Sequence, residues 1–209
     1  MANYLFEDWS FSVIFIICKK NKIMVSEIKQ ISVSEFRQME FDENDESYYE
    51  LINGYIMKKS APRPEHQSIS MYLSIQLGIY IKNRQLGKLF AAPIDVFLDQ
   101  INAVQPDLVF ITSVNQEKIT TDGIIGIPDL VIEIISPTSV IRDRVDKKNL
   151  YERLNVQEYW IIDPQYQDVE IYTIENNRYE LYSGITMFEG ELKSKLLEGI
   201  DINLKEIFL

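Results

Sequence analysis

The stretch Pro128-Asp-Leu-Val-Ile-Glu-Ile-Ile-Ser-Pro137 sets a single carboxylate inside a run of apolar, mostly β-branched residues. Such a run, bounded by prolines, predicts a buried strand over residues 130–135. Glu133 interrupts the run, and a charge among apolar neighbours is costly to bury without a partner. Taken alone, Glu133 fits two interpretations equally well: a functional carboxylate, or a strand-edge carboxylate paired with an arginine or a backbone amide.

Two Pro-Asp pairs, Pro106-Asp107 and Pro128-Asp129, each precede Leu-Val at the start of a strand-like run. On one extended strand, Asp129 and Glu133 point the same way but lie roughly 13 Å apart, too far to share one ion. Asp107, on a neighbouring strand, is the better partner, although aspartate after proline is often only a turn or a cap. Carboxylates on adjacent strands are typical ligands of Mg²⁺, which takes one or two of them with waters and phosphate oxygens.

The surrounding sequence predicts further elements. Asn53-Gly54 indicates the tight turn of a hairpin over residues 49–58, and apolar residues at helical spacing predict a long helix over residues 69–84. Shorter helices are expected at 33–39 and 142–154, strands at 89–98, 104–112 and 158–162, and a closing hairpin from 169–173 and 179–182. This order predicts an α/β fold in which helices flank a mixed central β-sheet.

The length of 209 residues, with 46% hydrophobic and 25% charged residues, fits one globular domain with a sizeable core. Residues 1–23 look unlike the rest, so we expect an N-terminal extension of unassigned function before a domain at 24–209. Met24 is a candidate natural start; alternatively, residues 11–18 form an added strand or a contact surface.

Several compartments and site types are disfavoured by the sequence. No run approaches the roughly 20 apolar residues of a membrane helix, and acids precede residues 11–18 where a secretory signal carries bases. We therefore expect a cytoplasmic protein without a membrane partner. Cys18 is the only cysteine, which excludes an internal disulfide and a cysteine-based zinc site within one chain.

The net charge of −11 argues at first against a nucleic-acid partner, because phosphate binding usually needs a basic face. The acids are partly confined to residues 40–50, which carry no base, whereas residues 142–153 hold five bases against three acids. Two further basic clusters are Lys58, Lys59 and Arg63, and Lys82, Arg84 and Lys88. Each cluster alone is best interpreted as a solvated face, but together they leave a phosphate-binding face open.

A set of motifs in fixed order resembles a known family. They are Tyr49-Glu-Leu-Ile-Asn-Gly54, Pro64-Glu-His66, Gln105-Pro-Asp107, Pro128 to Pro137, Arg142-Asp-Arg144, Lys147, Tyr151 and Glu158-Tyr-Trp-Ile-Ile-Asp-Pro164. From about residue 33 to the C-terminus the chain resembles the Uma-type restriction endonucleases of the PD-(D/E)XK nuclease superfamily. The resemblance implies a restriction-endonuclease-like fold and metal-dependent phosphodiester hydrolysis. It makes Asp107 and Glu133 the ligands of Mg²⁺, with Mn²⁺ as an alternative.

One departure concerns the lysine that the superfamily places two residues after the glutamate, where this chain has Ile135. The resemblance implies that Lys147, on the following helix, supplies this positive charge instead. Asp143, Lys147 and Tyr151 recur at four-residue spacing and share one helix face, which could turn toward Glu133. The alternative is an ordinary surface ion pair between Asp143 and Lys147, worth a few tenths of a kcal/mol.

The resemblance adds His66 and Glu50 as catalytic candidates. His66, the only histidine, could contact phosphate or orient water, although a lone histidine is more often structural. Glu50 could supply a third carboxylate, although its place beside five other acids makes a solvated side chain nearly as good an interpretation. Tyr151, Tyr159 and Trp160 are expected to fill the core rather than to stack on bases.

These observations predict a Mg²⁺-dependent endodeoxyribonuclease acting on double-stranded DNA. A catalytically silent nucleic-acid-binding or assembly module with the same fold is the rival, and a nuclease for RNA or branched DNA stays open. We expect a homodimer, because two sites related by a two-fold axis can cut both strands of a duplex. The C-terminal hairpin and helix, or the helix at 66–84, are candidate contacts.

Overall fold

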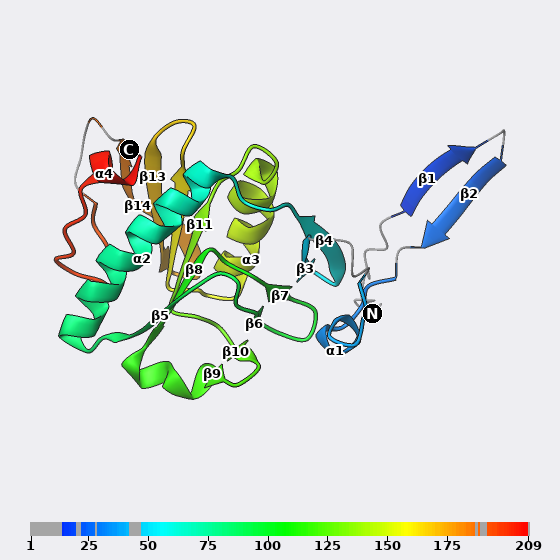
Figure 1. Cartoon of the computed structure of the whole chain (residues 1–209). Helices are drawn as coiled ribbons and strands as arrows, with labels where there is room; N and C mark the ends of the chain where they lie inside the picture. Colours follow the sequence, from blue (N-terminus) through cyan, green and yellow to red (C-terminus); the bar gives the residue numbers. More distant parts are fainter. Residues whose placement is uncertain are drawn as a thin grey trace, which may run out of the picture.

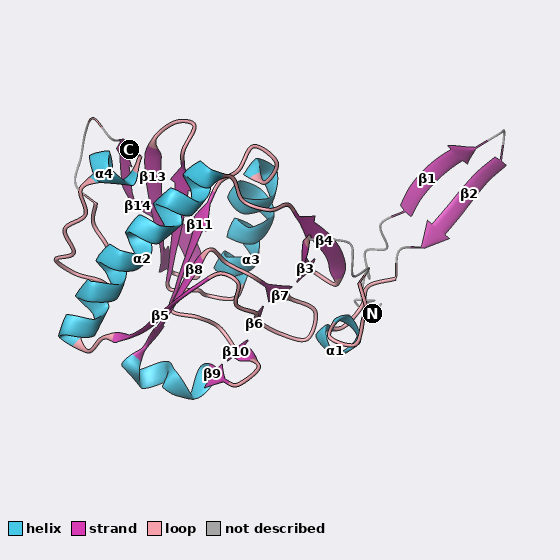
Figure 2. Cartoon of the chain, in the orientation of Figure 1, coloured by secondary structure: helices cyan, strands magenta, loops and turns pink. Residues whose placement is uncertain are grey.

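The computed structural model describes residues 14–19, 22–27, 29–41, 47–186, 188 and 192–208. At its centre lies a six-stranded mixed sheet with the order β14-β13-β12-β11-β8-β5 (Figures 1 and 2). Strands β11 and β12 pair in parallel, and the other neighbours pair antiparallel. The strands are β5 (Gly87–Ala91), β8 (Leu108–Thr112), β11 (Leu130–Ile134), β12 (Glu158–Asp163), β13 (Asp168–Glu175) and β14 (Arg178–Thr186). The predicted mixed central sheet is confirmed.

Strand β11 lies inside this sheet, and all five of its residues are buried. Because successive side chains of a strand point to opposite faces, its apolar residues divide between two cores. Leu130, Ile132 and Ile134 pack in one core, and Val131 joins the other. Glu133 has the parity of Val131, so its carboxylate points toward the second core.

Helix α2 (Pro64–Arg84) covers the first core with Ile69, Leu73 and Leu77. The predicted helix is confirmed and begins one turn earlier than its apolar pattern, at Pro64. Proline suits this position because its fixed φ matches the helix and the first N–H groups need no partner within the helix.

The second core lies between the central sheet, a helical segment and a second sheet. The helical segment begins as a wide π turn (Arg142–Lys147) and continues as α3 (Lys148–Arg153). The second sheet has the order β4-β3-β7-β6-β10-β9. Its strands are β3 (Tyr48–Ile52), β4 (Tyr55–Lys59), β6 (Val96–Phe97), β7 (Ala103–Val104), β9 (Ile119–Thr120) and β10 (Gly123–Ile125). The predicted hairpin is confirmed as β3 and β4, with positive φ at both Asn53 and Gly54.

Two of the predicted strands are wrong in their extent, because each is divided into two shorter strands in the structure. The run at 89–98 is divided between β5 and β6, which belong to different sheets, and the run at 104–112 is divided between β7 and β8. Pro93 and Pro106 lie at the breaks, where a residue without an N–H cannot continue the ladder. The helix expected at 33–39 is the shorter α1 (Val33–Phe36), which is capped by Ser32 and Glu35. The short helix η1 (Ser113–Lys118) was not expected, and the C-terminal helix is α4 (Leu204–Ile207).

Near the N-terminus, β1 (Ile14–Lys19) and β2 (Lys22–Glu27) pair antiparallel as a separate two-stranded sheet. Part of the run at 11–18 therefore does form a strand, while residues 1–13 lie outside the described residues, as do residues 42–46 of the acidic stretch. Met24 lies within β2, and the division at residue 24 stays a prediction. Within the described residues, no helix has the length and apolar character needed to cross a bilayer.

Candidate active site

Asp107 and Glu133 lie beside each other at one end of the paired strands β8 and β11. Leu108 pairs with Ile132, and extending this antiparallel register by one residue sets Asp107 opposite Glu133. The backbone N–H of Ile134 donates to Asp107 Oδ2 at 2.8 Å. Both carboxylates are almost completely buried, with 3% and 1% of each residue exposed. Asp107 therefore lies directly before β8, the strand next to that of Glu133, and beside Glu133 as the sequence predicted.

Lys147 reaches Glu133 from the helical segment that follows β11. Its Nζ donates to Glu133 Oε1 and to Glu50 Oε1, each at 2.8 Å, and lies 3.9 Å from Asp143 Oδ1. The side chain is 0% exposed, so the interpretation as an ordinary surface pair with Asp143 is wrong. From the next turn, the Tyr151 hydroxyl donates to Glu133 Oε1 at 3.0 Å. The helix face predicted from the four-residue spacing thus provides both a cation and a hydroxyl group for Glu133.

Glu50, on β3, is held in the same buried cluster. Its Oε1 accepts hydrogen bonds from Lys147 and from the backbone N–H of Gln105, the latter at 2.9 Å. Its residue exposure is 0%, so the interpretation of a solvated side chain is wrong. Its Oε2 and Arg142 Nε lie 3.9 Å apart, and each is buried without a hydrogen-bond partner among the described residues.

Asp107 is contacted by two further bases from other elements. His66, in the first turn of α2, places Nε2 at 3.0 Å from Asp107 Oδ2. Lys59, the last residue of β4, donates to Asp107 Oδ1 at 3.1 Å and to the Gln105 carbonyl at 3.0 Å. From the sequence, Lys59 was predicted only as part of a basic cluster, without a role at the site. Lys147 therefore bonds to Glu133 and Lys59 bonds to Asp107, so the two carboxylates take their lysine partners from different elements.

The buried cluster holds more acid than base. It contains the carboxylates of Glu50, Asp107, Glu133 and Asp143 and the cations of Lys59, Lys147 and Arg142, a formal surplus of one negative charge when His66 is neutral. Burial raises the pKa of Glu133 to about 7 despite the opposing charge of Lys147. Burial also raises the pKa of Asp143. A further cation or proton would therefore stabilise this end of the sheet.

Glu50 and Glu133 share Lys147, yet their pKa values move in opposite directions. Burial would raise the pKa of Glu50, but Lys147, Lys59 and the Gln105 N–H hold it below its ordinary value. Glu133 instead lies near the like charges of Asp143 and Asp107. For Asp107 itself, burial is outweighed by Lys59 and His66, which hold its pKa well below the usual range. Burial would lower the pKa of Lys147, but its three carboxylate neighbours keep it above its ordinary value.

The donor set fits a hard cation bound by two carboxylates. Asp107 and Glu133 line a cavity of about 180 Å³ together with Lys59, His66 and Arg142. Within the part of the chain that the structure describes, no group of three or more His, Cys, Asp or Glu side chains is arranged to hold a metal. Magnesium commonly uses only one or two carboxylates and completes its shell with water and phosphate oxygens. The surplus negative charge and the oxygen ligands suit such an ion.

The other predicted residues lie outside this cluster. Asp129 accepts hydrogen bonds from the Thr112 N–H at 2.7 Å and from Asn115 Nδ2 at 2.6 Å, which makes it a structural brace between strands and loop. Tyr159 and Trp160 are fully buried, as expected for core residues.

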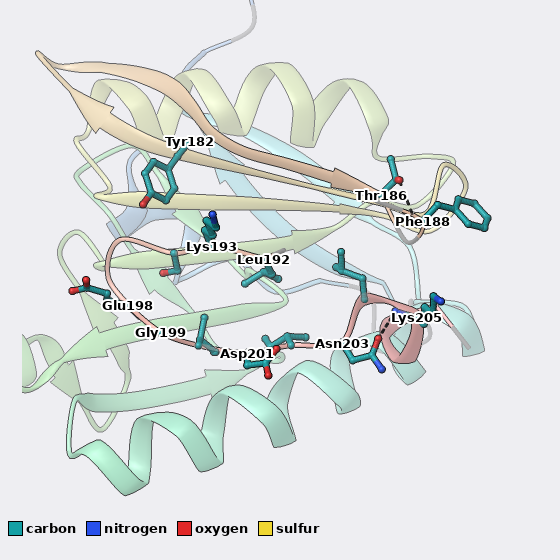
Figure 3. A pocket seen from close by; sticks show the side chains of 14 residues that line it. Tyr182, Thr186, Phe188, Leu192, Lys193, Glu198, Gly199, Asp201, Asn203 and Lys205 are labelled. Atoms are coloured by element: carbon teal, nitrogen blue, oxygen red, sulfur yellow. Dashed lines mark hydrogen bonds between the residues drawn. The ribbon is translucent and has the colours of Figure 1, made fainter. Parts of the chain in front are cut away.

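A wider hollow of about 950 Å³ lies elsewhere, between β14 and the C-terminal segment that leads to α4 (Figure 3). Tyr182, Lys193, Glu198 and Asp201 are among its lining residues. It contains none of the predicted site residues, and its charged side chains are spread along the hollow rather than gathered at one point (Figure 3). We therefore assign the candidate site to the smaller cavity beside Asp107 and Glu133.

A mixed sheet with an aspartate before one strand, a glutamate on the next and a buried lysine beside them defines the class of restriction-endonuclease-like folds. The model of the Uma2 family, described as "putative restriction endonuclease", matches residues 33–205, and the chain belongs to this family.

One solved structure extends the comparison. It is the crystal structure of a "putative nuclease belonging to DUF820" from Anabaena variabilis, with a TM-score of 0.68 and 20% sequence identity. The match covers 85% of this chain and 97% of that chain, and it shows the shared fold. No protein with a curated description matches the chain.

Proposed function

We propose that this protein is a divalent-metal-dependent endonuclease that hydrolyses phosphodiester bonds in double-stranded DNA. The observation that carries the proposal is the buried arrangement of Asp107, Glu133 and Lys147, in which the lysine donates to Glu133 at 2.8 Å although no lysine follows Glu133 in the strand. Membership of a family described as restriction endonucleases supports the proposal.

Each side chain of the cluster has a part in this proposal. Asp107 and Glu133 would hold Mg²⁺ or Mn²⁺, which would lower the pKa of a water molecule and neutralise charge on the phosphate. Lys147 supplies the positive charge beside Glu133 and fixes the orientation of its carboxylate. Glu50 holds Lys147 from the other side, and His66 orients Asp107 while lining the cavity, where it can contact water or phosphate.

The cavity rim favours a phosphate-bearing substrate. Lys59, Arg63 and Arg142 line the cavity together with the carboxylates of Asp107, Glu133 and Asp143, so bases and acids are balanced there although the whole chain is acidic. A bound divalent cation would make this lining net positive and would thereby attract the phosphate backbone. We also propose a homodimer, because a cluster of this size serves one strand at a time.

One observation favours the rival, a silent binding or assembly module. Both oxygens of Asp107 already have partners, since Oδ1 accepts from Lys59 while Oδ2 bonds with His66 and the Ile134 N–H. A protein without a metal would be stable in this form. Metal binding therefore distinguishes the two functions.

The test compares the wild-type chain with Asp107→Asn. We expect wild-type protein to bind Mn²⁺ in calorimetry and to cleave DNA, and Asp107→Asn to lose measurable binding and to cleave at least about 100-fold more slowly. Asp129→Asn is the matched control, because it changes the other Pro-Asp-Leu-Val motif outside the cavity, and it should retain both properties. Assays on single-stranded, duplex and branched DNA and on RNA identify the substrate. Wild-type protein that binds no Mg²⁺ or Mn²⁺ at millimolar concentration would establish the silent module instead.

A further inference from the structure

Of the two lysines that contact the carboxylates of the candidate site, Lys59 is the one that lines its cavity. It lines the cavity with Asp107 and Glu133, and 18% of its side chain is exposed. Lys147 is completely enclosed and is not among the lining residues. The two lysines therefore differ in access: Lys147 contacts the carboxylates from within the protein, and Lys59 contacts Asp107 from the cavity side.

The attachment of the two lysines differs as well. Lys147 bonds to two carboxylates at 2.8 Å and projects from a helical segment packed against the sheet. Lys59 is the last residue of β4, an outer strand of the second sheet, and an exposed stretch from Ser60 to Arg63 follows it. A long, flexible lysine side chain in this place can leave its partner with little movement of the backbone.

Among the residues that the structure describes, Lys59 is the one partner of Asp107 Oδ1. Oδ2 is bonded to the Ile134 N–H and His66, whereas Oδ1 bonds to Lys59 alone among the described residues. A divalent cation bound to Asp107 Oδ1 would lie beside the Lys59 ammonium group, which bonds to the same oxygen at 3.1 Å. The cation and the ammonium group repel each other strongly in a buried site, so they cannot bind this oxygen together.

We propose that Lys59 is the resident counter-ion of Asp107 in the metal-free protein and that it gives up this carboxylate when a divalent cation binds. This inference rests on the metal site of the proposed function. Lys59 then points its ammonium group into the cavity of about 180 Å³, where it meets a negatively charged phosphate group. Asp107 thus keeps a cationic partner in both states, and the empty site is protected from an unpaired buried charge.

The test measures metal affinity rather than cleavage. We expect Lys59→Met to bind Mn²⁺ about tenfold more tightly than the wild-type chain in calorimetry, because the ion no longer displaces a competing charge. In buffer with EDTA the same variant should melt at a lower temperature, since Asp107 has lost a partner, and Mn²⁺ should raise its melting temperature by more than it raises that of the wild type.

Two controls identify the cause. Lys59→Arg keeps the charge and should bind Mn²⁺ as the wild type does. Lys82→Met removes a charge from the last turn of α2, about 24 Å along the helix from His66, and should leave the affinity unchanged. Unchanged or weaker Mn²⁺ binding by a folded Lys59→Met, or no binding by either protein, would overturn the proposal. A wild-type chain that binds metal but cleaves no nucleic acid refutes the nuclease and leaves this comparison of affinities intact.

Discussion

Lys147 is enclosed by three carboxylates, so it stabilises the fold whether or not it takes part in a reaction. Its effect on stability must therefore be measured separately from its effect on the cleavage rate. Its removal leaves Glu50 and Glu133 buried beside each other without their shared cation. Breaking a buried ion pair by removing one partner typically costs about 3–5 kcal/mol, so a loss of activity in a single variant could reflect unfolding alone.

Two variants separate these effects: the single variant Lys147→Met, and the double variant that combines Lys147→Met with Glu50→Gln. The single variant should lose about 3–5 kcal/mol of unfolding free energy, and the double variant should recover part of this because one unpaired carboxylate is gone. If Lys147 supplies charge to the reaction, the folded double variant should cleave roughly two to three orders of magnitude more slowly while its Mn²⁺ affinity stays nearly intact. Urea denaturation, calorimetry and cleavage rates measure the three quantities.

Lys148 is the internal control for this prediction. Its Nζ lies 3.6 Å from the centre of the Tyr172 ring, on a different side of the helix from the site. Lys148→Met should cost about 0.5–1 kcal/mol and leave the cleavage rate unchanged. A double variant that cleaves at the wild-type rate would contradict the assignment of Lys147.

The site residues differ in how far local sequence reveals them. Glu133 is conspicuous because it interrupts an apolar strand, and Asp107 follows from the geometry of neighbouring strands. Lys147 required the family resemblance, because its spacing alone equally fits a surface pair. Lys59 could not be found in this way, since its partner lies 48 residues further along the chain and only the packing of β4 against the Gln105 segment joins them.

At the scale of elements, the edge strand β5 depends on a single glycine. Gly87 pairs with Thr112 of β8, and a Cβ atom at Gly87 would lie 2.0 Å from the carbonyl oxygen of Ile111. Backbone atoms on the neighbouring strand cannot yield as a flexible side chain can. Gly87→Ala should therefore separate the start of β5 from β8 and cost roughly 2–4 kcal/mol of unfolding free energy in urea denaturation.

Gly78, in the middle of α2, is the matched control because nothing lies within 4 Å of an added Cβ there. Alanine favours a helix interior over glycine, so Gly78→Ala should stabilise the protein by about 0.5–1 kcal/mol. Equal changes in unfolding free energy for Gly87→Ala and Gly78→Ala would show that the close contact between β5 and β8 does not limit the residue at position 87.

Elements with strong local signals could be predicted, and elements defined by distant contacts could not. The β3–β4 hairpin has its Asn-Gly turn, and α2 has a long apolar repeat. Strands β6 and β7 contain two residues each, too few for any periodic pattern, and they exist because they pair with each other and with β10 and β3. The helix predicted at 142–154 is present, but ordinary helical spacing did not predict that Arg142–Lys147 forms a wide π turn, a feature frequent at functional sites.

At the scale of the whole molecule, α2 presents an apolar face that no described element covers. Met71, Ile75 and Ile79 are 64%, 48% and 56% exposed and lie along one stripe of the helix (α2 in Figure 1). The start of α2 holds Arg63 at the N-cap and Glu65 in the first turn, so the helix begins without a net acidic charge, and the stripe itself is apolar along its length. In an antiparallel pair of α2 helices around a two-fold axis near Ile75, Met71 and Ile79 of one copy would pack against Ile79 and Met71 of the other. This self-complementary apolar contact favours a second copy of the chain as the partner of the stripe.

The last prediction is that Ile75→Glu converts a dimer into a monomer. A two-fold axis near Ile75 brings the two substituted side chains together, so two buried carboxylates would repel each other at the centre of the interface. Light scattering at micromolar concentration should show a dimer for the wild type and a monomer for this variant. The variant should also nick duplex DNA more than it cuts both strands, because each molecule then carries one active site.

Leu181→Glu is the control, because Leu181 lies on the exposed surface of β14 in the C-terminal hairpin. If α2 and not this hairpin forms the dimer contact, Leu181→Glu should leave the dimer intact. A wild-type monomer, or a dimer broken by Leu181→Glu and not by Ile75→Glu, would exclude α2 as the interface.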